Sequence, residues 1–296
     1  MSSSPSVIWI WTQAARPKTL WAAVAPVLVG SALAWRDGVF HWPSALAALL
    51  GGILLQIAAN FANDLFDFER GADTHERLGP LRVTHAGLVS PRAMRTALFI
   101  VIAIAFAIGI YLVWRGGWPI VAIGLCSIVA LILYTGGPFP YGYRGLGELF
   151  VFIFFGGAAV GGTYWVQALA ITPTAIWVSA SMGCLAVAIL VVNNLRDIDT
   201  DRAAGKRTLA VMLGRTGARV EYVVVLIVAA CVPVALVLLH LGTAWVMLAT
   251  AGTLLAVPMI RTAFRATDGP TLNGVLAQTA RLQLLYGILL SIGLNL

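Results

Sequence analysis

Two short stretches of the chain carry carboxylates at the spacing of one helical turn. Asp64 and Asp67 lie three residues apart in "NDLFD", so on a helix both project from one side, with about 5–6 Å between their Cβ atoms. In "DIDTD", Asp197 and Asp201 lie four residues apart, and Asn193 lies four residues before Asp197. Carboxylate and amide oxygens are the hard ligands that Mg²⁺ selects. Because Mg²⁺ usually takes one or two protein carboxylates and shares its remaining shell with phosphate and water, the two stretches predict a magnesium-bound diphosphate.

Further polar side chains extend this predicted site. Three more candidate metal ligands lie near the first stretch: Asn60, Asn63 and Asp73. The second stretch is followed by two cations, Lys206 and Arg207, whose charges suit the oxygens of a diphosphate. Other cations that we expect to contact it are Arg77, Arg82 and Arg144. Metal and cations together would stabilise the charge that develops on a departing diphosphate.

The composition places this site in a membrane protein. The chain has 296 residues, of which 60% are hydrophobic and 10% charged, whereas soluble domains carry about 25% charged residues. Membrane spans need roughly 20 mostly apolar residues and must be helical, because lipid offers no partner to open backbone groups. The apolar runs predict nine spans, at 19–35, 43–63, 94–113, 118–134, 147–168, 174–195, 220–240, 242–260 and 277–294. Residues 6–15 predict a short interfacial helix.

The chain reads as one domain, 1–296, made of two related halves. The two acidic stretches both follow an apolar run that ends in Asn, and both precede a basic loop. This pattern predicts an internal repeat, with halves at roughly 16–140 and 141–296.

Charged residues gather in the loops on one side of the predicted membrane. All of the 19 Lys and Arg residues except Arg36 and Arg115 fall there, a bias typical of cytoplasmic loops. The net charge of +7 therefore indicates membrane orientation rather than a nucleic-acid partner. We expect a multi-pass protein of the bacterial inner membrane, with its N-terminus and its site on the cytoplasmic side. All acidic residues except Asp37 lie on that side too, which the positive bias does not require.

Two other interpretations of the acids remain open at this point. Aspartates at the ends of spans are often solvated residues without a function, although two matched clusters make this less favourable. Acids inside a membrane also mark ion or proton transporters, but carboxylates in transporters lie near the bilayer midplane, and these lie at span ends. A transporter would also leave the neighbouring basic residues unexplained.

The motifs resemble those of the UbiA superfamily of intramembrane prenyltransferases. The family has an Asn-Asp-x-x-Asp motif with a third acid, and a later Asp-x-x-x-Asp motif. Here the third acid, Asp73, lies six residues beyond Asp67, whereas many members have it four beyond, where this chain has Gly71. Longer stretches resemble the 1,4-dihydroxy-2-naphthoate polyprenyltransferases of menaquinone synthesis: "RPKTL" (16–20), "FDFERGADTHERLGPLRVTHAGLVSP" (66–91), "YTGGPFPYGYRGLGELFVFIFFG" (134–156) and "NNLRDIDTDRAAGKRTLAVMLG" (193–214).

This resemblance implies a fold and a reaction. The fold is nine transmembrane helices around a central cavity that opens sideways to admit the prenyl chain. In the reaction, a polyprenyl diphosphate ionises with the help of Mg²⁺, and the allylic cation alkylates the ring carbon of 1,4-dihydroxy-2-naphthoate that bears the carboxylate. Diphosphate and CO₂ leave, and demethylmenaquinone results. Another aromatic acceptor, such as 4-hydroxybenzoate, is the alternative, against which the "GPLRVT" and "YTGGPFP" loops argue.

The resemblance also suggests roles for further residues. Lys18, and less so Arg16, would meet the aromatic carboxylate or the phosphate. The loop at 134–148 carries Tyr134, Tyr143 and Arg144 and would cap the cavity; the tyrosine rings would stabilise the allylic cation by cation–π contact. Glu148 would orient a basic residue or take a phenolic proton. The expected catalytic residues are Asp64, Asp67, Asp197, Asp201, Lys206 and Glu148. Prenyl chain length and oligomeric state do not follow from the sequence.

Overall fold

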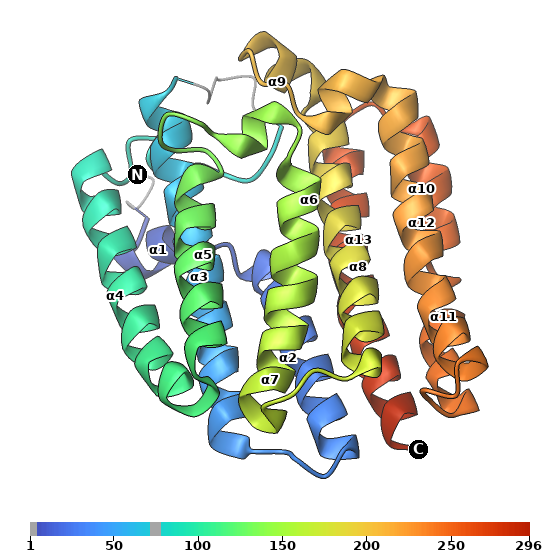
Figure 1. The fold of residues 1–296 in the computed structure, drawn as a ribbon. Helices are drawn as coiled ribbons and strands as arrows, with labels where there is room; N and C mark the ends of the chain where they lie inside the picture. The colour runs from blue at the N-terminus through green and yellow to red at the C-terminus, as the bar shows by residue number, and fades with distance from the viewer. Residues whose placement is uncertain (1–4, 72–77) are drawn as a thin grey trace.

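The computed structural model describes residues 5–71 and 78–296, and these residues form helices and no strand (Figure 1). The elements are α1 (Val7–Ala15), α2 (Pro17–Arg36), α3 (Trp42–Glu69), α4 (Pro91–Gly116), α5 (Trp118–Leu133), the 3₁₀ turn η1 (Tyr141–Arg144), α6 (Gly147–Val151), the π-helix η2 (Phe152–Gly161), α7 (Gly162–Ala168), α8 (Pro173–Arg196), α9 (Ile198–Ala203), α10 (Leu209–Leu238), the 3₁₀ turn η3 (Ala244–Val246), α11 (Met247–Thr253), α12 (Ala256–Arg265) and α13 (Gly269–Asn295).

A helix stands at each of the nine predicted spans. Eight helical segments in the described part of the chain are long and apolar enough to cross a membrane; α6, η2 and α7 form one of them, and η3, α11 and α12 another. The predicted span at 118–134 is α5, whose 16 residues cover about 24 Å, less than the roughly 30 Å of a hydrocarbon core. Nine spans therefore stay a prediction. The predicted helix at 6–15 is confirmed as α1.

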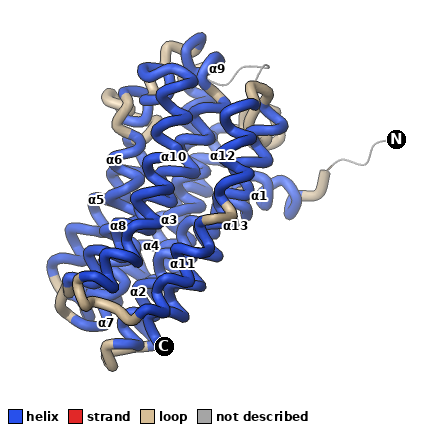
Figure 2. The backbone as a smooth tube through the Cα atoms, turned by 90° about the vertical axis from the view of Figure 1, so that its right-hand side faces the viewer, coloured by secondary structure: helices blue, strands red, loops and turns tan. Residues whose placement is uncertain are grey.

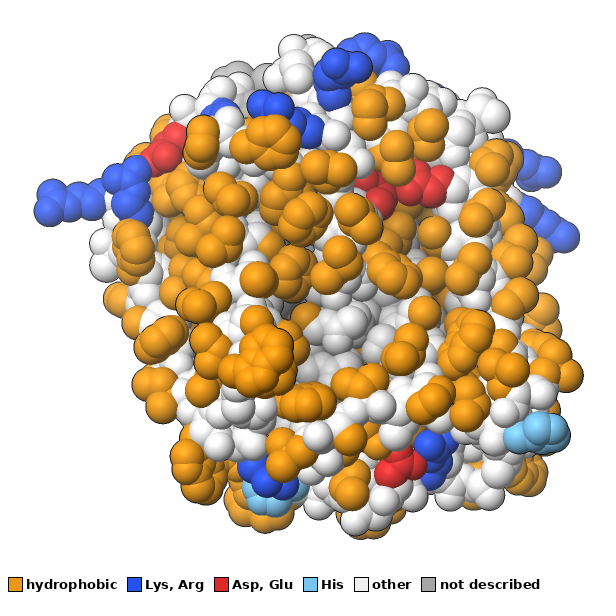
Figure 3. All heavy atoms as spheres, in the orientation of Figure 1, with side chains coloured by type: hydrophobic (Ala, Val, Ile, Leu, Met, Phe, Trp, Pro, Cys, Tyr) orange, Lys and Arg blue, Asp and Glu red, His pale blue; other side chains and the backbone are white. Residues whose placement is uncertain are grey.

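Most of the helices run along one axis, and the two ends of the bundle differ. Figure 2 shows α9 at one end, the C-terminus at the other, and α1 projecting from the side. In Figure 3, hydrophobic side chains cover the middle of the face, Lys and Arg lie mostly toward the end that carries α9, and the face is hollowed near its centre. This distribution fits a bundle embedded in a membrane with its charged end in water.

The larger hydrophobic core surrounds α8. It joins residues of α8 to those of α2, α10 and α13, and 72% of the most apolar stretch of α8 is buried. A smaller core joins α1, α3, α4 and the loop at 83–89, and only 11% of the most apolar stretch of α4 is buried. Because α4 packs chiefly on α3 and exposes its other side, it lies at the edge of the bundle.

Glycines let the π-helix η2 approach α8 closely. A Cβ on Gly156 would lie 2.5 Å from the backbone oxygen of Ser179, and one on Gly183 would lie 2.9 Å from the backbone oxygen of Phe152. Small residues at such crossings are typical of membrane helices. The close packing fixes η2 so that the side chains of Phe154 and Ala158 face the interior of the bundle, where the candidate site lies.

Candidate active site

A cavity of about 690 Å³ lies between α2, α3, α4, α5, η2 and α8. One end is lined by charged and amide side chains: Arg16, Lys18, Asn63, Asp67, Arg82, Asn193, Asn194, Asp197, Asp201 and Lys206. The rest of the wall is largely apolar and includes Phe106, Ile110 and Phe154. A second, apolar pocket of about 980 Å³ is lined by residues of α5 and η2 and shares Tyr141, Phe150 and Phe154 with the first. The arrangement suits a ligand with a charged head and an apolar tail.

Asp67 contacts residues from both the first and the second half of the sequence. It is 2% exposed; its Oδ2 accepts a hydrogen bond from Nη2 of Arg82 at 2.5 Å, and its Oδ1 accepts one from the hydroxyl of Tyr143. Nζ of Lys206 lies 3.5 Å from Oδ1 of Asp67 and 3.7 Å from Oδ1 of Asp201. Lys206 also stands 4.5 Å above the ring of Tyr143. Acids and cations predicted from distant parts of the sequence therefore form one network.

Tyr143 remains a hydrogen-bond donor over a wide range of pH. Burial raises the pKa of its hydroxyl well above the ordinary value, and the charge of Asp67 and the hydrogen bond to it raise the pKa further. The proton therefore stays on Tyr143, which helps to fix the carboxylate beside Lys206.

Asp64 has a different role from Asp67 in this structure. It is 1% exposed and does not line the cavity. Its Oδ2 accepts a hydrogen bond from the backbone N–H of Val83 at 3.0 Å, and its Oδ1 accepts one from the N–H of Thr84 at 3.2 Å. The carboxylate thereby anchors the loop that carries Arg82. Its predicted role as a metal ligand stays a prediction.

The two asparagines of the first stretch divide in the same way. Asn60 faces the junction of α1 and α2, where its Nδ2 donates to the backbone oxygen of Ala15 at 2.9 Å and to Oγ1 of Thr19 at 3.0 Å. Asn63 lines the cavity, and its Oδ1 accepts a hydrogen bond from the hydroxyl of Thr135 at 3.1 Å. Asn63 and Asp67 therefore face the cavity, while Asn60 and Asp64 hold the surrounding elements.

In the second stretch, the buried Arg196 holds the predicted metal ligands in place. The sequence interpretation counted this residue only as a cytoplasmic charge. Arg196 is 2% exposed and grips Asp197 with two bonds, Nε to Oδ1 at 2.7 Å and Nη2 to Oδ2 at 2.5 Å. It also donates to Oδ1 of Asn193 at 2.9 Å and to Oδ1 of Asn273 at 2.7 Å. Its position directly before Asp197 and three residues after Asn193 was the signal for this role.

The second stretch is not one continuous helix. α8 ends at Arg196 and α9 begins at Ile198, with Asp197 between them at φ −94° and ψ 9°. The N–H of Asp201 still donates to the backbone oxygen of Asp197 at 2.7 Å. Asn193, Asp197 and Asp201 all line the cavity, so the break does not separate them.

The other predicted site residues lie in three kinds of place. Arg16, Lys18 and Tyr134 line the cavity. Arg144 and Arg207 are exposed and away from its wall; the guanidinium of Arg144 lies 3.8 Å above the ring of Phe139. Asp73 and Arg77 lie outside the described residues.

Glu148 is buried behind the cavity wall. It is 8% exposed, and its Oε1 accepts a hydrogen bond from Nδ2 of Asn194 at 2.8 Å. Its Oε2 has no hydrogen-bond partner among the residues that the structure describes. Because Asn194 lines the cavity, Glu148 fixes the orientation of that amide, a pairing that the sequence interpretation missed.

The donor set suits a hard divalent ion that shares its shell with a ligand. Asn63, Asp67, Asn193, Asp197 and Asp201 line the same end of the cavity. Within residues 5–71 and 78–296, no three Asp, Glu, His or Cys residues gather closely enough to enclose a metal by themselves. Oxygen donors that converge without closing a cage fit Mg²⁺, which completes its coordination with phosphate and water.

Known proteins resemble this chain over almost its whole length. The 1,4-dihydroxy-2-naphthoate octaprenyltransferase of Escherichia coli (strain K12) is 38% identical over 293 residues, which cover 97% of this chain and 95% of the relative. Four further relatives of that name are 32% to 41% identical.

Two solved structures share the fold. The apo structure of a UbiA homolog from Aeropyrum pernix K1 aligns with a TM-score of 0.70 at 19% identity, covering 94% of this chain and 97% of that one. A UbiA homolog from Archaeoglobus fulgidus, solved bound to GPP and Mg²⁺, aligns with a TM-score of 0.64 at 16% identity, covering 95% and 99%. Residues 23–278 match the model of the UbiA prenyltransferase family. With these matches in sequence and fold, the chain belongs to the UbiA prenyltransferase family.

Proposed function

We propose that this enzyme transfers a polyprenyl group from polyprenyl diphosphate to 1,4-dihydroxy-2-naphthoate, releasing diphosphate and CO₂ and giving demethylmenaquinol, the reduced form of demethylmenaquinone. The observation that carries the proposal is the cavity with acids and cations of both halves at one end and an apolar wall beyond them. The relatives support the choice of acceptor, because five of them carry the name 1,4-dihydroxy-2-naphthoate octaprenyltransferase.

The charged end of the cavity is the proposed diphosphate site. Asn63, Asp67, Asn193, Asp197 and Asp201 would hold Mg²⁺, in keeping with the Archaeoglobus homolog solved with GPP and Mg²⁺. When bound, Mg²⁺ neutralises diphosphate oxygens and makes diphosphate a better leaving group. Asn60 and Asp64 support the site from behind, and Asp73 is proposed as a further ligand.

The chain's own cations stabilise the leaving group. Arg82 and Lys206 are held by Asp67 at the cavity wall, so they need no rearrangement as negative charge develops on the diphosphate. Arg77, Arg144 and Arg207 are proposed as outer cations that attract the substrate. The faces of Tyr134, Tyr143 and Phe150 would stabilise the allylic cation, and the apolar wall keeps water from capturing it.

The acceptor would enter beside the first turn of α2. Arg16 and Lys18 line the cavity there and would bind the carboxylate of the naphthoate. The ring carbon that bears the carboxylate forms a bond to the allylic carbon, and the bond to the carboxylate then breaks to release CO₂. No net proton is lost, because the carboxylate supplies the electron pair that restores the aromatic ring. Glu148 acts through Asn194, whose amide faces the acceptor.

The proposed orientation places the charged end of the cavity in the cytoplasm of a bacterial inner membrane, with α5 as the ninth span. The exposed basic residues on that end support it. Reaction of a cysteine introduced at position 38, in the loop between α2 and α3, with a membrane-impermeant maleimide in intact cells would test it. Labelling only after lysis would contradict this orientation.

The decisive experiment uses the purified protein in detergent. With 1,4-dihydroxy-2-naphthoate, a polyprenyl diphosphate and Mg²⁺, we expect prenylated naphthoquinol and CO₂, and no product once EDTA removes the metal. Prenylation of 4-hydroxybenzoate in place of the naphthoate would overturn the acceptor assignment. Full activity in EDTA would overturn the metal assignment.

A further inference from the structure

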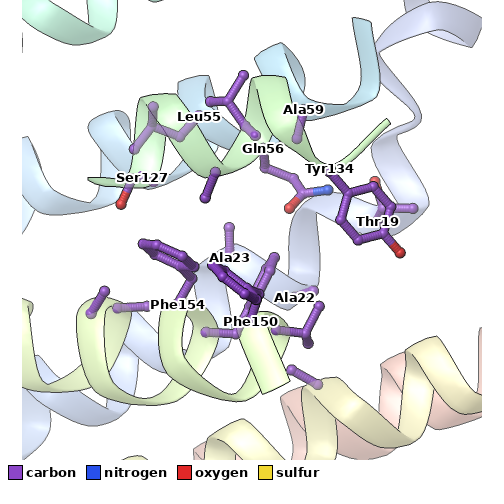
Figure 4. A pocket seen from close by; sticks show the side chains of 18 of the residues that line it. Thr19, Ala22, Ala23, Leu55, Gln56, Ala59, Ser127, Tyr134, Phe150 and Phe154 are labelled. Atoms are coloured by element: carbon purple, nitrogen blue, oxygen red, sulfur yellow. The ribbon is translucent and has the colours of Figure 1, made fainter. Parts of the chain in front are cut away.

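A polar side chain that the proposed reaction does not yet use faces the cavity from α3. Gln56 lies one turn before Asn60, and Figure 4 shows its side chain reaching into the space between α3 and the wall that carries Phe150 and Phe154. Asn60 donates two hydrogen bonds to neighbouring elements, but the amide of Gln56 forms none with the part of the chain that the structure describes. An amide within a membrane cavity is costly unless it is hydrogen-bonded, so its presence points to a ligand.

The packing of α2 against α3 leaves room for a flat ligand beside Gln56. The two helices run antiparallel, and the bond between Asn60 and Thr19 sets their register. One turn deeper on both helices, Gln56 therefore lies level with Ala22 and Ala23 (Figure 4). Their methyl side chains leave space that larger residues would fill. Phe150 lines the other side, so the space is bounded by an amide, two small residues and an aromatic ring.

The position of Gln56 relative to the cations selects one part of the acceptor. Arg16 precedes Thr19 by one turn, and Ala23 lies about 10 Å beyond Arg16 along α2. A naphthoate whose carboxylate meets Arg16 and Lys18 would therefore direct its far side toward Gln56. The 1-hydroxyl is adjacent to the carboxylate, whereas the 4-hydroxyl is not. Of the two hydroxyls, the 4-hydroxyl would therefore lie nearer the amide.

We propose that Gln56 determines acceptor specificity by hydrogen-bonding the 4-hydroxyl of 1,4-dihydroxy-2-naphthoate. The inference rests on the proposed function, because it assumes that acceptor. It adds a residue that neither the metal motifs nor the basic loops indicate. A site built to bond a hydroxyl discriminates against analogues that lack it, because the amide is then left unpaired.

The test combines one substitution with one change in the ligand. Gln56→Leu removes both the donor and the acceptor of the amide; for this variant we expect the Kd of 1,4-dihydroxy-2-naphthoate, measured from the fluorescence of its ring, to rise about 5- to 10-fold, the effect of one hydrogen bond. The Kd of 1-hydroxy-2-naphthoate, which lacks only the 4-hydroxyl, should change less than twofold. The KM of polyprenyl diphosphate should also stay unchanged.

Ser127→Ala is the matched control, because Ser127 is another polar side chain on the cavity wall, two turns before Tyr134 on α5 (Figure 4). It should alter neither Kd by more than twofold. Gln56→Met, closer in shape to Gln, provides the same measurement if the Leu variant does not fold.

Equal losses of affinity for both naphthoates, or a rise only in the KM of polyprenyl diphosphate, would overturn the role of Gln56. These outcomes are distinct from failure of the proposed function. In that case the unsubstituted enzyme itself would not prenylate 1,4-dihydroxy-2-naphthoate.

Discussion

In the first acidic stretch both carboxylates are bound by groups far along the chain, whereas in the second the main partner of Asp197 is the residue before it. Asp64 accepts the N–H groups of Val83 and Thr84, and Asp67 binds Arg82, Tyr143 and Lys206. Asp197 is held by Arg196. The carboxylates of the first stretch are therefore positioned by residues distant in the sequence, whereas Asp197 in the second is positioned mainly by the residue next to it.

The two aspartates of the first stretch also differ from each other. Residues three apart on a helix point about 60° apart around its axis. That angle lets Asp67 line the cavity while Asp64 reaches the loop at 82–84. Spacing alone predicted a shared face, but the contacts assign one carboxylate to the cavity and the other to its support.

The largest effect is expected from Asp67→Asn. The substitution removes the negative charge that Arg82 and Lys206 contact on α3 and so weakens this network. We expect kcat/KM to fall about 100- to 1,000-fold, as when a group that stabilises developing charge is lost. The Mg²⁺ concentration for half-maximal activity should rise. An unchanged requirement for Mg²⁺ would remove Asp67 from the proposed ligands.

Asp64→Asn tests the division within the first stretch. The amide of asparagine has one oxygen that accepts and one nitrogen that only donates, so one of the two loop N–H groups loses its acceptor. We therefore expect the free energy of unfolding to fall by about 1–3 kcal/mol. Displacement of Arg82 should lower kcat about 10- to 100-fold. The Mg²⁺ requirement should stay that of the unsubstituted enzyme. If it shifts as far as in Asp67→Asn, Asp64 is a metal ligand, as its spacing first predicted.

Arg196→Lys tests whether Arg196 positions the predicted ligands of the second stretch. Lysine keeps the charge but has no planar group to bond Asp197 at two points while reaching Asn193 and Asn273. We expect kcat/KM to fall about tenfold, through misplaced ligands. Arg202→Lys is the control, because Arg202 is exposed and lies 3.7 Å from Asp199 at the surface. Equal activities of the two variants would show that Arg196 does not position the ligands.

The sequence was informative where structure depends on local composition. Apolar runs located the helices, and loop charges placed both acidic stretches at one end, because burial in lipid constrains every residue of a span. It predicted a span at 43–63 with Asp64 and Asp67 one turn apart on a helix, and α3 does continue through both aspartates to Glu69.

The remaining features depend on contacts between distant residues. The partners of Asp64 lie 19 and 20 residues away, and Arg196 meets Asn273, 77 residues on. No local pattern separates a buried arginine of this kind from the solvated charges beside it. Gln56 was missed for the same reason, since a single amide within an apolar run gains meaning only when the cavity beside it is known.

Tyr143→Phe should have the smallest effect and isolates one bond of the Asp67 network. It removes the hydroxyl that donates to Oδ1 of Asp67 but keeps the ring beneath Lys206, and Arg82 and Lys206 still hold the carboxylate. We therefore expect kcat/KM to fall about 3- to 10-fold, the effect of one ordinary hydrogen bond.

The same variant gives a signature in stability against pH. Because the pKa of Tyr143 is higher in the folded protein than its unfolded value of about 10, the group contributes stability that is full below pH 10 and is lost as pH rises above it. The midpoint of thermal unfolding should therefore fall more steeply between pH 9 and 11 in the unsubstituted enzyme than in Tyr143→Phe. Parallel curves would mean that the Tyr143 hydroxyl does not hold its proton for Asp67, and that the contacts of Asp67 with Arg82 and Lys206 do not depend on it.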